Sequence, residues 1–415
     1  MTTFLNYLLK QAESKVVITM QSKGLIGNHD LVKKINMEHT IKTILQHRPL
    51  SRAKIAALTG LNKMTVSSCV DLFLQKGIVV ELGTTGTSRG RPPVLVDINE
   101  QAGVCIGVDV EINQFTVLVT DLLGKIAESR VYPLDNKNPH YFVDKISRIL
   151  ADLEKSHAHR ELGVVGAGIV IQGYYNIETN MVEYSANLQE WNSFPLMEEL
   201  SKRNPSLAMW INPAPYAGAM GEVHFGRAKS TDHLVYVTSS WGLSVGVYHK
   251  GELFTGATGT AGRLGHSTIH MNGKKCSCGS RGCWEMYASV KALYELLDTT
   301  PQQLSFADIV AGVNSGDAKL TSAIHELGHY HGIGLANVVN AYNPKVICIG
   351  GLLALLGSPL INSIWNTLRE MIPDRFLKNL DIYCSDLGEL GVAHGGVSMV
   401  MDRLSNTIIH HSLAE

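Results

Sequence analysis

The pattern of apolar and polar residues predicts a helical region near the start of the chain. Three segments place apolar side chains at helical spacing, residues 29–47, 52–59 and 63–76. Arg48-Pro49 ends the first segment, because proline lacks an amide hydrogen and restricts the residue before it. Ser51 and Asn62 stand where they can cap the second and third helices, and Gly60-Leu61 supplies the tight turn between those helices.

A β-hairpin is predicted to follow these helices. Two short β-rich runs, residues 77–81 and 93–96, flank a glycine-rich loop over residues 83–90. Two short helices joined by a glycine-containing turn, after a leading helix, form the helix-turn-helix pattern, and the hairpin would be its wing. Residues 1–97 are therefore predicted to be a winged helix-turn-helix DNA-binding domain with an N-terminal extension.

Beyond a polar stretch over residues 97–103, which we expect to be a linker, one pattern occurs twice. In each occurrence, three short β-rich runs precede helix and a buried strand. The first set covers residues 104–110, 115–120, 126–132, 141–157 and 164–170, and the second covers 234–238, 243–248, 252–254, helices from 285 onward and 346–349. The repetition predicts a duplicated α/β domain with a ligand-binding cleft between its halves.

The body of the chain is accordingly divided into three expected parts. We place the first α/β lobe at residues 98–225 and the second lobe at residues 226–385. The C-terminal segment, residues 386–415, has roughly helical apolar spacing from Val397 to Ile409, so we expect it to return to the body as helix.

Composition is that of an ordinary globular protein, but the charge is unevenly distributed. The 415 residues are 45% hydrophobic and 18% charged, and the net charge is −1. Ten Lys or Arg and only four acids lie between Asp30 and Leu95, so this segment is about +6 and the rest about −7. The near-zero total would argue against a nucleic-acid partner, whereas the segregation favours a basic module on an acidic body.

Neither a membrane span nor a secretory signal is predicted. The longest apolar run, Val346 to Gly357, is much shorter than the ~20 residues that a spanning helix needs. The N-terminus carries Lys10, Glu13 and Lys15 and has no cleavage site of small residues after an apolar core. We therefore expect a cytoplasmic protein with no membrane partner.

Candidate DNA contacts lie on the predicted helices and wing. Polar and basic side chains of these elements can donate to base edges and phosphates, and arginines at a wing tip can enter the minor groove. The candidates are Arg52, Lys63, Thr65, Ser67, Ser68, Arg89 and Arg91. The alternative interpretation is a small helical domain with a solvated basic face. Agreement among helix spacing, hairpin and local charge favours duplex DNA.

A metal site is the clearest chemical motif. His266 precedes the run Cys276-Ser277-Cys278-Gly279-Ser280-Arg281-Gly282-Cys283. One imidazole and three thiolates, from His266, Cys276, Cys278 and Cys283, complete a tetrahedral set for zinc, and four protein ligands leave no position open for catalysis. We therefore predict a structural zinc ion, the alternative being three reduced surface cysteines.

The zinc motif resembles the signature of the ROK family, which contains repressors and sugar kinases. Three further stretches resemble the family. Residues 27–36 and Gly90-Arg91-Pro92 resemble the N-terminal part of its repressors, and residues 185–191 resemble its sugar-side loop. The stretch Cys276–Ser289 is most similar to members of the xylose-repressor type. The resemblance implies an α/β chain, a winged helix-turn-helix joined to a duplicated actin-like (RNase H-like) ATPase or sugar-kinase fold with a zinc loop.

Two departures from the family pattern argue against catalysis. ROK kinases carry an Asn-Asp pair whose aspartate is the general base, and here the pair is Asn212-Pro213. The kinases also carry Glu-x-Gly-His, and here Arg263 replaces the glutamate, so a carboxylate acceptor has become a guanidinium donor. Loss of a positioned base typically costs roughly 10²–10⁴-fold in rate. We predict no catalytic residues and no kinase activity.

The phosphate-binding loops also depart from the kinase pattern. Residues 109–113, Asp-Val-Glu-Ile-Asn, lack the glycines that let backbone amides approach a nucleotide, and Glu111 would repel phosphate. Trp241 stands in the second loop, which is glycine-rich in the family, whereas Gly350-Gly351 is retained.

A sugar-binding function is implied by the positions that stay polar. By the resemblance, Asn187, Asn212, His266 and Glu285 correspond to sugar contacts, and Arg263 would join them. Arginine pairs well with carboxylate or phosphate, so one hypothesis is an acidic or phosphorylated sugar effector. The other is a vestigial pocket in which Arg263 pairs with Glu285 or Glu222.

These features predict a ligand-responsive transcriptional regulator that represses genes of carbohydrate uptake and catabolism, xylose metabolism included. Its expected partners are an operator in double-stranded DNA, a sugar or sugar derivative, and further copies of itself in a homodimer or homotetramer. Two alternatives are a ROK sugar kinase with an added DNA-binding domain, which Pro213 and Arg263 disfavour, and a repressor controlled by a protein partner such as a phosphotransferase.

Overall fold

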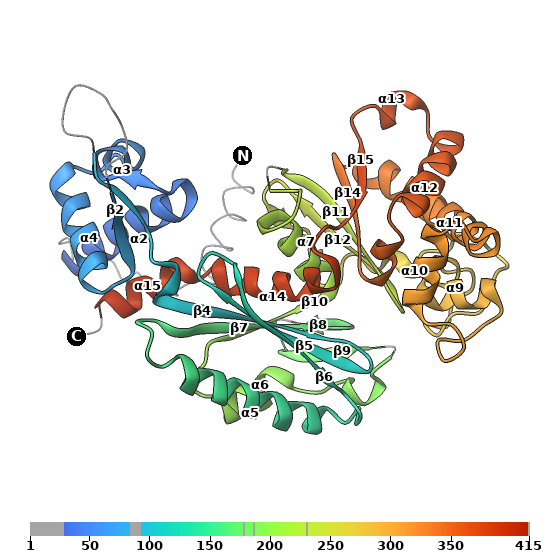
Figure 1. Ribbon diagram of the computed structural model, residues 1–415, viewed down its shortest axis with the longest axis horizontal. Coiled ribbons are helices and arrows are strands. Elements are labelled where there is room, and N and C mark those ends of the chain that lie inside the picture. Colours follow the sequence, from blue (N-terminus) through green and yellow to red (C-terminus); the bar gives the residue numbers. More distant parts are fainter. Residues whose placement is uncertain (1–28, 84–92, 177–178, 186, 230, 414–415) are drawn as a thin grey trace.

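The structure, a computed structural model, describes residues 29–83, 93–176, 179–185, 187–229 and 231–413. Its elements form an N-terminal domain and two α/β lobes, with the C-terminal helices running between the N-terminal domain and the lobes (Figure 1). Within these residues, every helix is too short or too polar to cross a membrane.

The N-terminal domain contains the three predicted helices and a small sheet. The helices are α2 (His29–His47), α3 (Arg52–Thr59) and α4 (Lys63–Gln75). The antiparallel sheet has the order β1-β3-β2 and is formed by β1 (Leu50–Ser51), β2 (Val79–Leu82) and β3 (Leu95–Ile98). The helix predictions are confirmed, and the two strands begin about two residues later than predicted. The loop tip that holds Arg89 and Arg91 lies outside the described residues.

The expectation of a linker over residues 97–103 is wrong. Strand β3 continues to Ile98, a 3-10 turn η1 (Glu100–Ala102) follows, and strand β4 starts at Gly103. Ile98 and Ala102 are only 3% and 1% exposed, and one hydrophobic core runs from α2 through them into the first lobe. Asn99 accepts a hydrogen bond from the Gln101 amide and donates to the Gly77 carbonyl. The polar residues there fix the backbone, so the connection is rigid.

The two lobes repeat one sheet topology. The first sheet has the order β6-β5-β4-β7-β10 and the second has β13-β12-β11-β14-β15. In both, the first three strands are antiparallel neighbours and the last two join in parallel. The strands are β4 (Gly103–Val110), β5 (Gln114–Asp121), β6 (Ile126–Pro133), β7 (Gly163–Ile171) and β10 (Met209–Pro213), then β11 (His233–Ser239), β12 (Leu243–His249), β13 (Glu252–Leu253), β14 (Val346–Gly350) and β15 (Asp381–Cys384). The predicted duplication is present in the fold.

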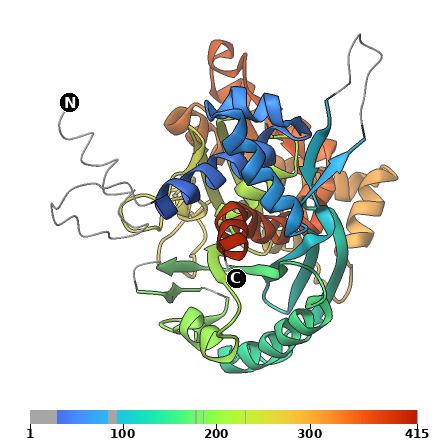
Figure 2. The ribbon, with the colours of Figure 1, turned by 90° about the vertical axis from the view of Figure 1, so that its left-hand side faces the viewer.

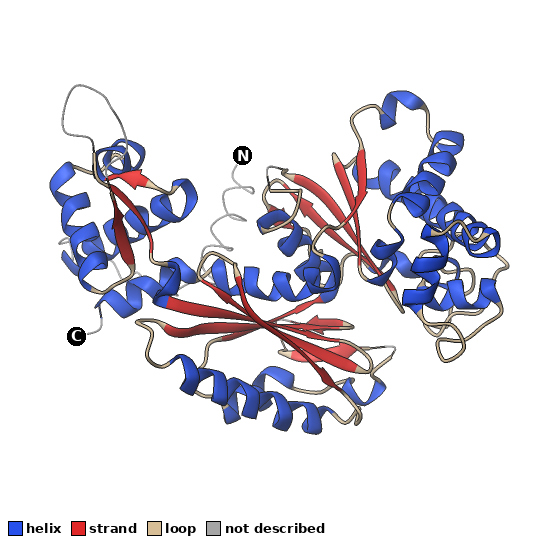
Figure 3. Cartoon of the chain, in the orientation of Figure 1, coloured by secondary structure: helices blue, strands red, loops and turns tan. Residues whose placement is uncertain are grey.

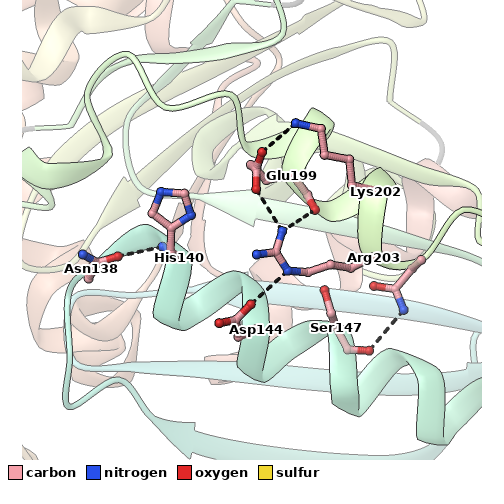
Figure 4. Close-up of polar contacts among 8 residues, drawn as sticks. Asn138, His140, Asp144, Ser147, Glu199, Lys202 and Arg203 are labelled. Carbon is pink, nitrogen blue, oxygen red and sulfur yellow. Dashed lines mark hydrogen bonds and ion pairs between the residues drawn. The ribbon is translucent and has the colours of Figure 1, made fainter.

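Helices cover the outer side of the first sheet (Figure 3). They are α5 (Pro139–His157) and α6 (Leu196–Arg203), and a small hairpin, β8 (Tyr174–Asn176) with β9 (Met181–Tyr184), extends this lobe. Figure 4 shows polar contacts between α6 and α5. The Arg203 guanidinium donates to Asp144 on α5 and to Glu199 on its own helix, both at 2.9 Å.

The second lobe carries more helix than the first. The helices are α8 (Glu285–Ala288), α9 (Val290–Leu297), α10 (Phe306–Asn314), α11 (Ala318–Tyr342), α12 (Ser358–Met371) and α13 (Asp374–Leu377). One large hydrophobic core joins α9 to α12 with the second sheet. These packed elements supply one wall of the two clefts that lie between the lobes.

Two helices lie at the junction of the lobes, α7 (Ala214–His224) and α14 (Gly391–Met401). Helix α14 packs on β4 and β7, and α7 packs on β11 and β12, so each helix covers the sheet of the other half. Close approach requires glycine in the first sheet. A Cβ at Gly107 would lie 2.0 Å from the Ala393 carbonyl oxygen, and one at Gly168 would lie 2.0 Å from that of Gly396.

The C-terminal segment is helical, as predicted, but it forms two helices. Helix α14 ends at Met401, and α15 (Leu404–Leu413) continues after a short turn. The apolar positions Val397, Val400, Leu404 and Ile408 are all buried. Helix α15 also contacts α2, so the chain terminus reaches the N-terminal domain (Figures 1 and 2).

Candidate functional site

A pocket of about 710 Å³, partly open to solvent, lies between the two lobes. Its walls come from the ends of β7 and β10, the β8–β9 hairpin, the start of α7, and β12, η3 (Arg263–His266) and α8 of the second lobe. The lining residues that carry polar side chains are Gln172, Tyr174, Tyr184, Ser185, Asn187, Tyr216, Thr238, Ser244, His266 and Glu285. A set of hydroxyl, amide and carboxylate groups around a concave site is suited to a polyhydroxylated ligand.

The structure brings three of the five predicted effector residues to this pocket. Asn187, His266 and Glu285 line it. Asn212 lies outside the lining, and its amide nitrogen is 3.8 Å from the Met220 sulfur. Arg263 stands beside the pocket, with its guanidinium carbon 4.8 Å from the ring centroid of Tyr174, which is a lining residue.

Arg263 pairs with neither Glu285 nor Glu222, the two acids proposed from the sequence as its partners. Glu285 accepts a hydrogen bond from the Leu243 amide at 2.8 Å. Glu222 is buried and accepts hydrogen bonds from the hydroxyls of Tyr383 and Ser385 and from the Arg227 amide. At the pocket rim, Arg263 instead makes a cation–π contact with Tyr174.

Pro213 also lines the pocket. It ends strand β10 at the position where the kinase motif would carry its aspartate. Among the described residues of the lining, Glu285 is the only carboxylic acid, and the backbone of Leu243 holds it. The pocket therefore lacks an acid at the general-base position but keeps groups that bind hydroxyls.

Two tyrosines that the sequence gave no reason to select also belong to the site. Tyr174 begins β8, two residues after Gln172, and Tyr216 lies on α7. The Tyr216 hydroxyl donates to the carbonyls of Gly259 and Ala261, at 3.2 and 2.8 Å, and so fixes the loop opposite. Burial raises the pKa of Tyr216 to about 12 and also raises that of Tyr174, so both hydroxyls stay protonated donors.

The predicted metal ligands form a compact cluster beside the pocket. One ligand atom from each of His266, Cys276, Cys278 and Cys283 lies within 4.8 Å of all the others. The Cys278–Cys283 sulfur distance and the distance from His266 Nδ1 to the Cys276 sulfur are both 3.6 Å. Four zinc–sulfur bonds of about 2.3 Å would place the ligand atoms at the corners of a tetrahedron whose edges are about 3.8 Å long. The two distances in the cluster are close to that edge length. The cluster can hold a metal ion, and it is part of the pocket wall because His266 belongs to both.

The pKa values of two thiols in the cluster are shifted in opposite directions. Burial raises the pKa of Cys283 to about 12. Burial acts in the same direction on Cys278, but hydrogen bonds from the Ser280 backbone and from its neighbouring cysteines outweigh burial and lower its pKa. The surroundings thus already favour one thiolate, which is the form that binds a metal.

The N-terminal helices present part of the predicted DNA surface. Ser51 caps α3 by accepting from the Lys54 amide, and Asn62 caps α4 by accepting from the Thr65 amide. Gly60, with φ of +72°, makes the turn between them. Of the predicted contacts on α4, Lys63 and Ser68 are exposed, whereas Thr65 and Ser67 are half-buried.

Arg52 differs from the other predicted contacts. Its guanidinium donates to Asp71 at 2.6 Å and to Glu81 at 2.9 Å, and it lies 3.3 Å from the Ser67 hydroxyl. The side chain therefore ties α3 to α4 and β2 within the domain.

Comparison with known proteins places the chain in a family. Residues 105–403 match the ROK family. The chain is 33% identical over 387 residues to the xylose repressor of Bacillus subtilis, a match that covers 92% of this chain and 99% of that protein.

Solved structures show the same architecture. A ROK family transcriptional regulator, described as a homologue of the Escherichia coli MLC protein, superposes with a TM-score of 0.77 at 24% identity and covers 92% of this chain and 98% of that one. A ROK family glucokinase from Streptomyces griseus, in complex with glucose and AMPPNP, gives a TM-score of 0.64 at 25% identity and covers 72% of this chain and 99% of that one. The body therefore has the sugar-kinase-like α/β fold, and the chain belongs to the ROK family.

Proposed function

We propose that the protein is a DNA-binding transcriptional repressor of carbohydrate uptake and catabolism genes that responds to a sugar. Pro213 in the wall of an intact sugar-type pocket carries this proposal, because such a pocket can bind a sugar but has no base to deprotonate it. The match to a xylose repressor over 92% of the chain supports the same reading. The body would then be a kinase-like fold that binds without catalysing.

The N-terminal domain would act as a winged helix-turn-helix. Helix α4 would enter the major groove and present Lys63, Thr65, Ser67 and Ser68 to bases and phosphates. Arg52 would reach DNA only by exchanging Asp71 and Glu81 for a phosphate. Arg89 and Arg91 lie outside the described residues, and we propose them as wing contacts from the sequence alone.

The pocket lining favours a neutral sugar as effector, xylose being the first to test. Asn187, His266 and Glu285 would accept or donate hydrogen bonds to its hydroxyls, with Asn212 reached only after a rotation of its side chain. Glu285 would repel an anionic ligand, and Arg263 would have to leave Tyr174 to offset that repulsion. An acidic or phosphorylated sugar therefore remains the competing hypothesis.

A structural zinc ion would hold the pocket together. Three thiolates and one imidazole fill its four positions, so the ion would stabilise the loop from Gly265 to Cys283 without taking part in a reaction. By orienting His266 and supporting α8, which carries Glu285, the ion would set the geometry of the sugar contacts.

The C-terminal helices offer a path from the pocket to DNA. Helix α14 packs against α7 and the first sheet at the junction of the lobes, and α15 packs on α2. A sugar that favours one arrangement of the lobes would shift α14 and, through α15, the N-terminal domain. In a homodimer or homotetramer this shift would change the spacing of two DNA-binding domains and thereby the affinity for an operator.

DNA selection with the full chain tests the proposal. Duplexes enriched from a random pool are expected to bind with dissociation constants of about 10⁻⁸–10⁻¹¹ M, and a neutral sugar should weaken that binding. Lys63→Glu should reduce affinity more than about tenfold, because one favourable phosphate contact becomes a repulsion. Lys155→Glu, an exposed change on α5, is the matched control.

Three results would count against the proposal. They are failure to select any duplex, equal loss of binding in both variants, and ATP-dependent phosphorylation of glucose, xylose or N-acetylglucosamine at ordinary enzyme rates. Release of DNA by a protein but by no sugar would replace the sugar effector with a protein partner.

A further inference from the structure

A second cleft, of about 1060 Å³ including the solvent space at its mouth, adjoins the pocket proposed to bind sugar (the sugar pocket) and is also built from both lobes. The chain segments that resemble phosphate loops meet there, namely residues 109–113, Ser240-Trp241 and Gly351. Three carboxylic acids line the cleft, Asp109, Glu111 and Glu389, and its described lining contains no Lys, Arg or His. A nucleotide would meet three acidic side chains and no cation in this lining, so the cleft is unsuited to phosphate.

Asp109 is the most informative of the three acids. It is 4% exposed, and its Oδ1 atom has no hydrogen-bond partner among the described residues. A buried carboxyl oxygen without a partner is costly, which points to a cationic partner brought by a ligand. Burial and the neighbouring Glu111 both raise the pKa of Asp109, and an ammonium group bound beside it would lower that pKa and favour the carboxylate.

The other two acids come from segments far apart in the chain. Glu111 follows β4 in the first lobe, and its Oε2 atom accepts a hydrogen bond from the Gln114 side chain at 2.9 Å. Glu389 lies in the 3-10 turn η5 (Gly388–Leu390) that leads into α14. Burial raises the pKa of Glu111, and repulsion from Glu389 adds to the effect, so the two carboxylates are close enough to interact.

The spacing of the acids distinguishes between two kinds of cation. Within the described part of the chain, the His266 cluster is the one group of three or more ligating side chains that come together closely enough to hold a metal ion. The three cleft acids do not form such a group. An extended molecule with several ammonium groups can instead reach each acid separately. Trp241, 39% exposed and stacked on Tyr294 at 5.9 Å, adds an aromatic surface that favours an organic cation.

We propose that this cleft binds a small diamine or polyamine, with ammonium groups paired to Asp109, Glu111 and Glu389 and the carbon chain against Trp241. Such a ligand would join the first lobe to the turn before α14. Gln172 and Thr238 line both this cleft and the sugar pocket, so occupancy of one cleft is expected to change affinity in the other. Only this coupling rests on the proposed function; binding of the amine does not.

Calorimetry on the full chain, freed of DNA, tests the proposal with 1,4-diaminobutane and spermidine as probes. Titrations are made at constant ionic strength, and MgCl₂ alone and ATP with MgCl₂ are titrated in parallel. Spermidine is expected to bind with a dissociation constant below about 1 mM, and Glu389→Gln should weaken it roughly 10- to 100-fold, because a charged hydrogen bond is lost. Asp109→Asn should weaken it as much.

The matched control is Asp152→Asn, which removes an exposed acid on α5 and should leave amine binding unchanged. Glu389 is exposed, so Glu389→Gln keeps the test meaningful even if Asp109→Asn disturbs folding. The proposal is overturned if neither amine binds, if all three variants bind alike, or if MgCl₂ alone binds at the same acids. Because no DNA or sugar is present, each of these failures leaves the proposed repressor function untouched.

Discussion

The sugar pocket and the acidic cleft are neighbours that share Gln172 and Thr238, yet their linings differ in kind. The pocket holds hydroxyl and amide groups with one carboxylate, Glu285, whose position the Leu243 amide fixes. The cleft holds three carboxylates, one of them buried without a hydrogen-bond partner. In a fold shared with sugar kinases, one lining offers groups that bind hydroxyls, while the other gathers acids and has no Lys, Arg or His among its described residues.

The difference shows that binding and catalysis depend on separate parts of one fold. Recognition of a sugar needs donors and acceptors held by a rigid wall, here the metal-binding loop and α8. Phosphoryl transfer needs, in addition, a base and a cationic or amide-lined phosphate site. Under the proposed function, Pro213 and the acidic cleft lack the second set, whereas the pocket keeps side chains that can bind hydroxyls. The following predictions test that separation, from the largest expected effect to the smallest.

Loss of the metal should damage the sugar pocket and spare the acidic cleft. Cys283→Ala removes a buried thiolate, so bound zinc should fall from one ion per chain to near zero, and the free energy of unfolding should fall by more than about 3 kcal/mol. Elemental analysis and thermal unfolding measure the two quantities. Ser277→Ala, an exposed change in the same loop, is the control. Full zinc content in Cys283→Ala would contradict the ligand assignment.

Glu285→Gln should weaken sugar binding roughly 10- to 100-fold, because a sugar hydroxyl loses a charged acceptor. The amide oxygen of glutamine can still accept from the Leu243 amide, so the fold of the wall should persist. Titration calorimetry with xylose and other neutral sugars makes the measurement. Glu190→Gln, an exposed substitution outside the pocket lining, should have no effect. If sugar phosphates bind and neutral sugars do not, the interpretation of the pocket as a neutral-sugar site is wrong.

Asp109→Asn should stabilise the protein at neutral pH by about 1–2 kcal/mol. Burial raises the pKa of Asp109 in the folded chain above 3.8, so the folded state holds a proton that the unfolded state releases. That contribution is present below pH 3.8 and is lost as the pH rises through the folded pKa. Urea unfolding measures the free energy of unfolding at pH 5 and at pH 8. Its decrease from pH 5 to pH 8 should be smaller for the variant than for the parent chain. Equal losses would mean that Asp109 titrates normally.

Pro213→Asp should leave kinase activity at background. The change restores an acid at the general-base position, but the acidic cleft still repels the nucleotide. A coupled assay with ATP and glucose or xylose makes the measurement. Turnover near 1 s⁻¹, which is ordinary for an enzyme, would show that the base alone separates this chain from its catalytic relatives.

Local features of the fold could be predicted closely. The helices at residues 29–47 and 52–59 agree with the structure at both ends, and the third helix starts at Lys63 as predicted. Ser51, Gly60 and Asn62 set the ends of the second helix and the start of the third through contacts a few residues away. The cluster that can hold a metal ion could be predicted for the same reason, since three of its four residues lie within eight positions of the sequence. The repeated strand pattern also predicted the duplicated lobes.

Side-chain partners from distant segments could not be predicted in the same way. Arg52 was expected to face DNA, but Asp71 and Glu81 neutralise it within the domain. Asn212 turns from the pocket toward Met220, and Tyr174 rather than an acid holds Arg263. Each of these contacts joins residues whose meeting depends on how helices and sheets pack.

The sequence by itself determined the order of the elements, the four residues of the cluster that can hold a metal ion, and the proline at position 213, because spacing and residue type carry that information. Only the tertiary structure decided that residues 97–103 are part of a continuous core and that α15 reaches α2. It also decided that Asp109 and Glu389, 280 positions apart in the chain, line one cleft. Burial and charge proximity are properties of packed surfaces, and a chain acquires them only when its distant segments meet.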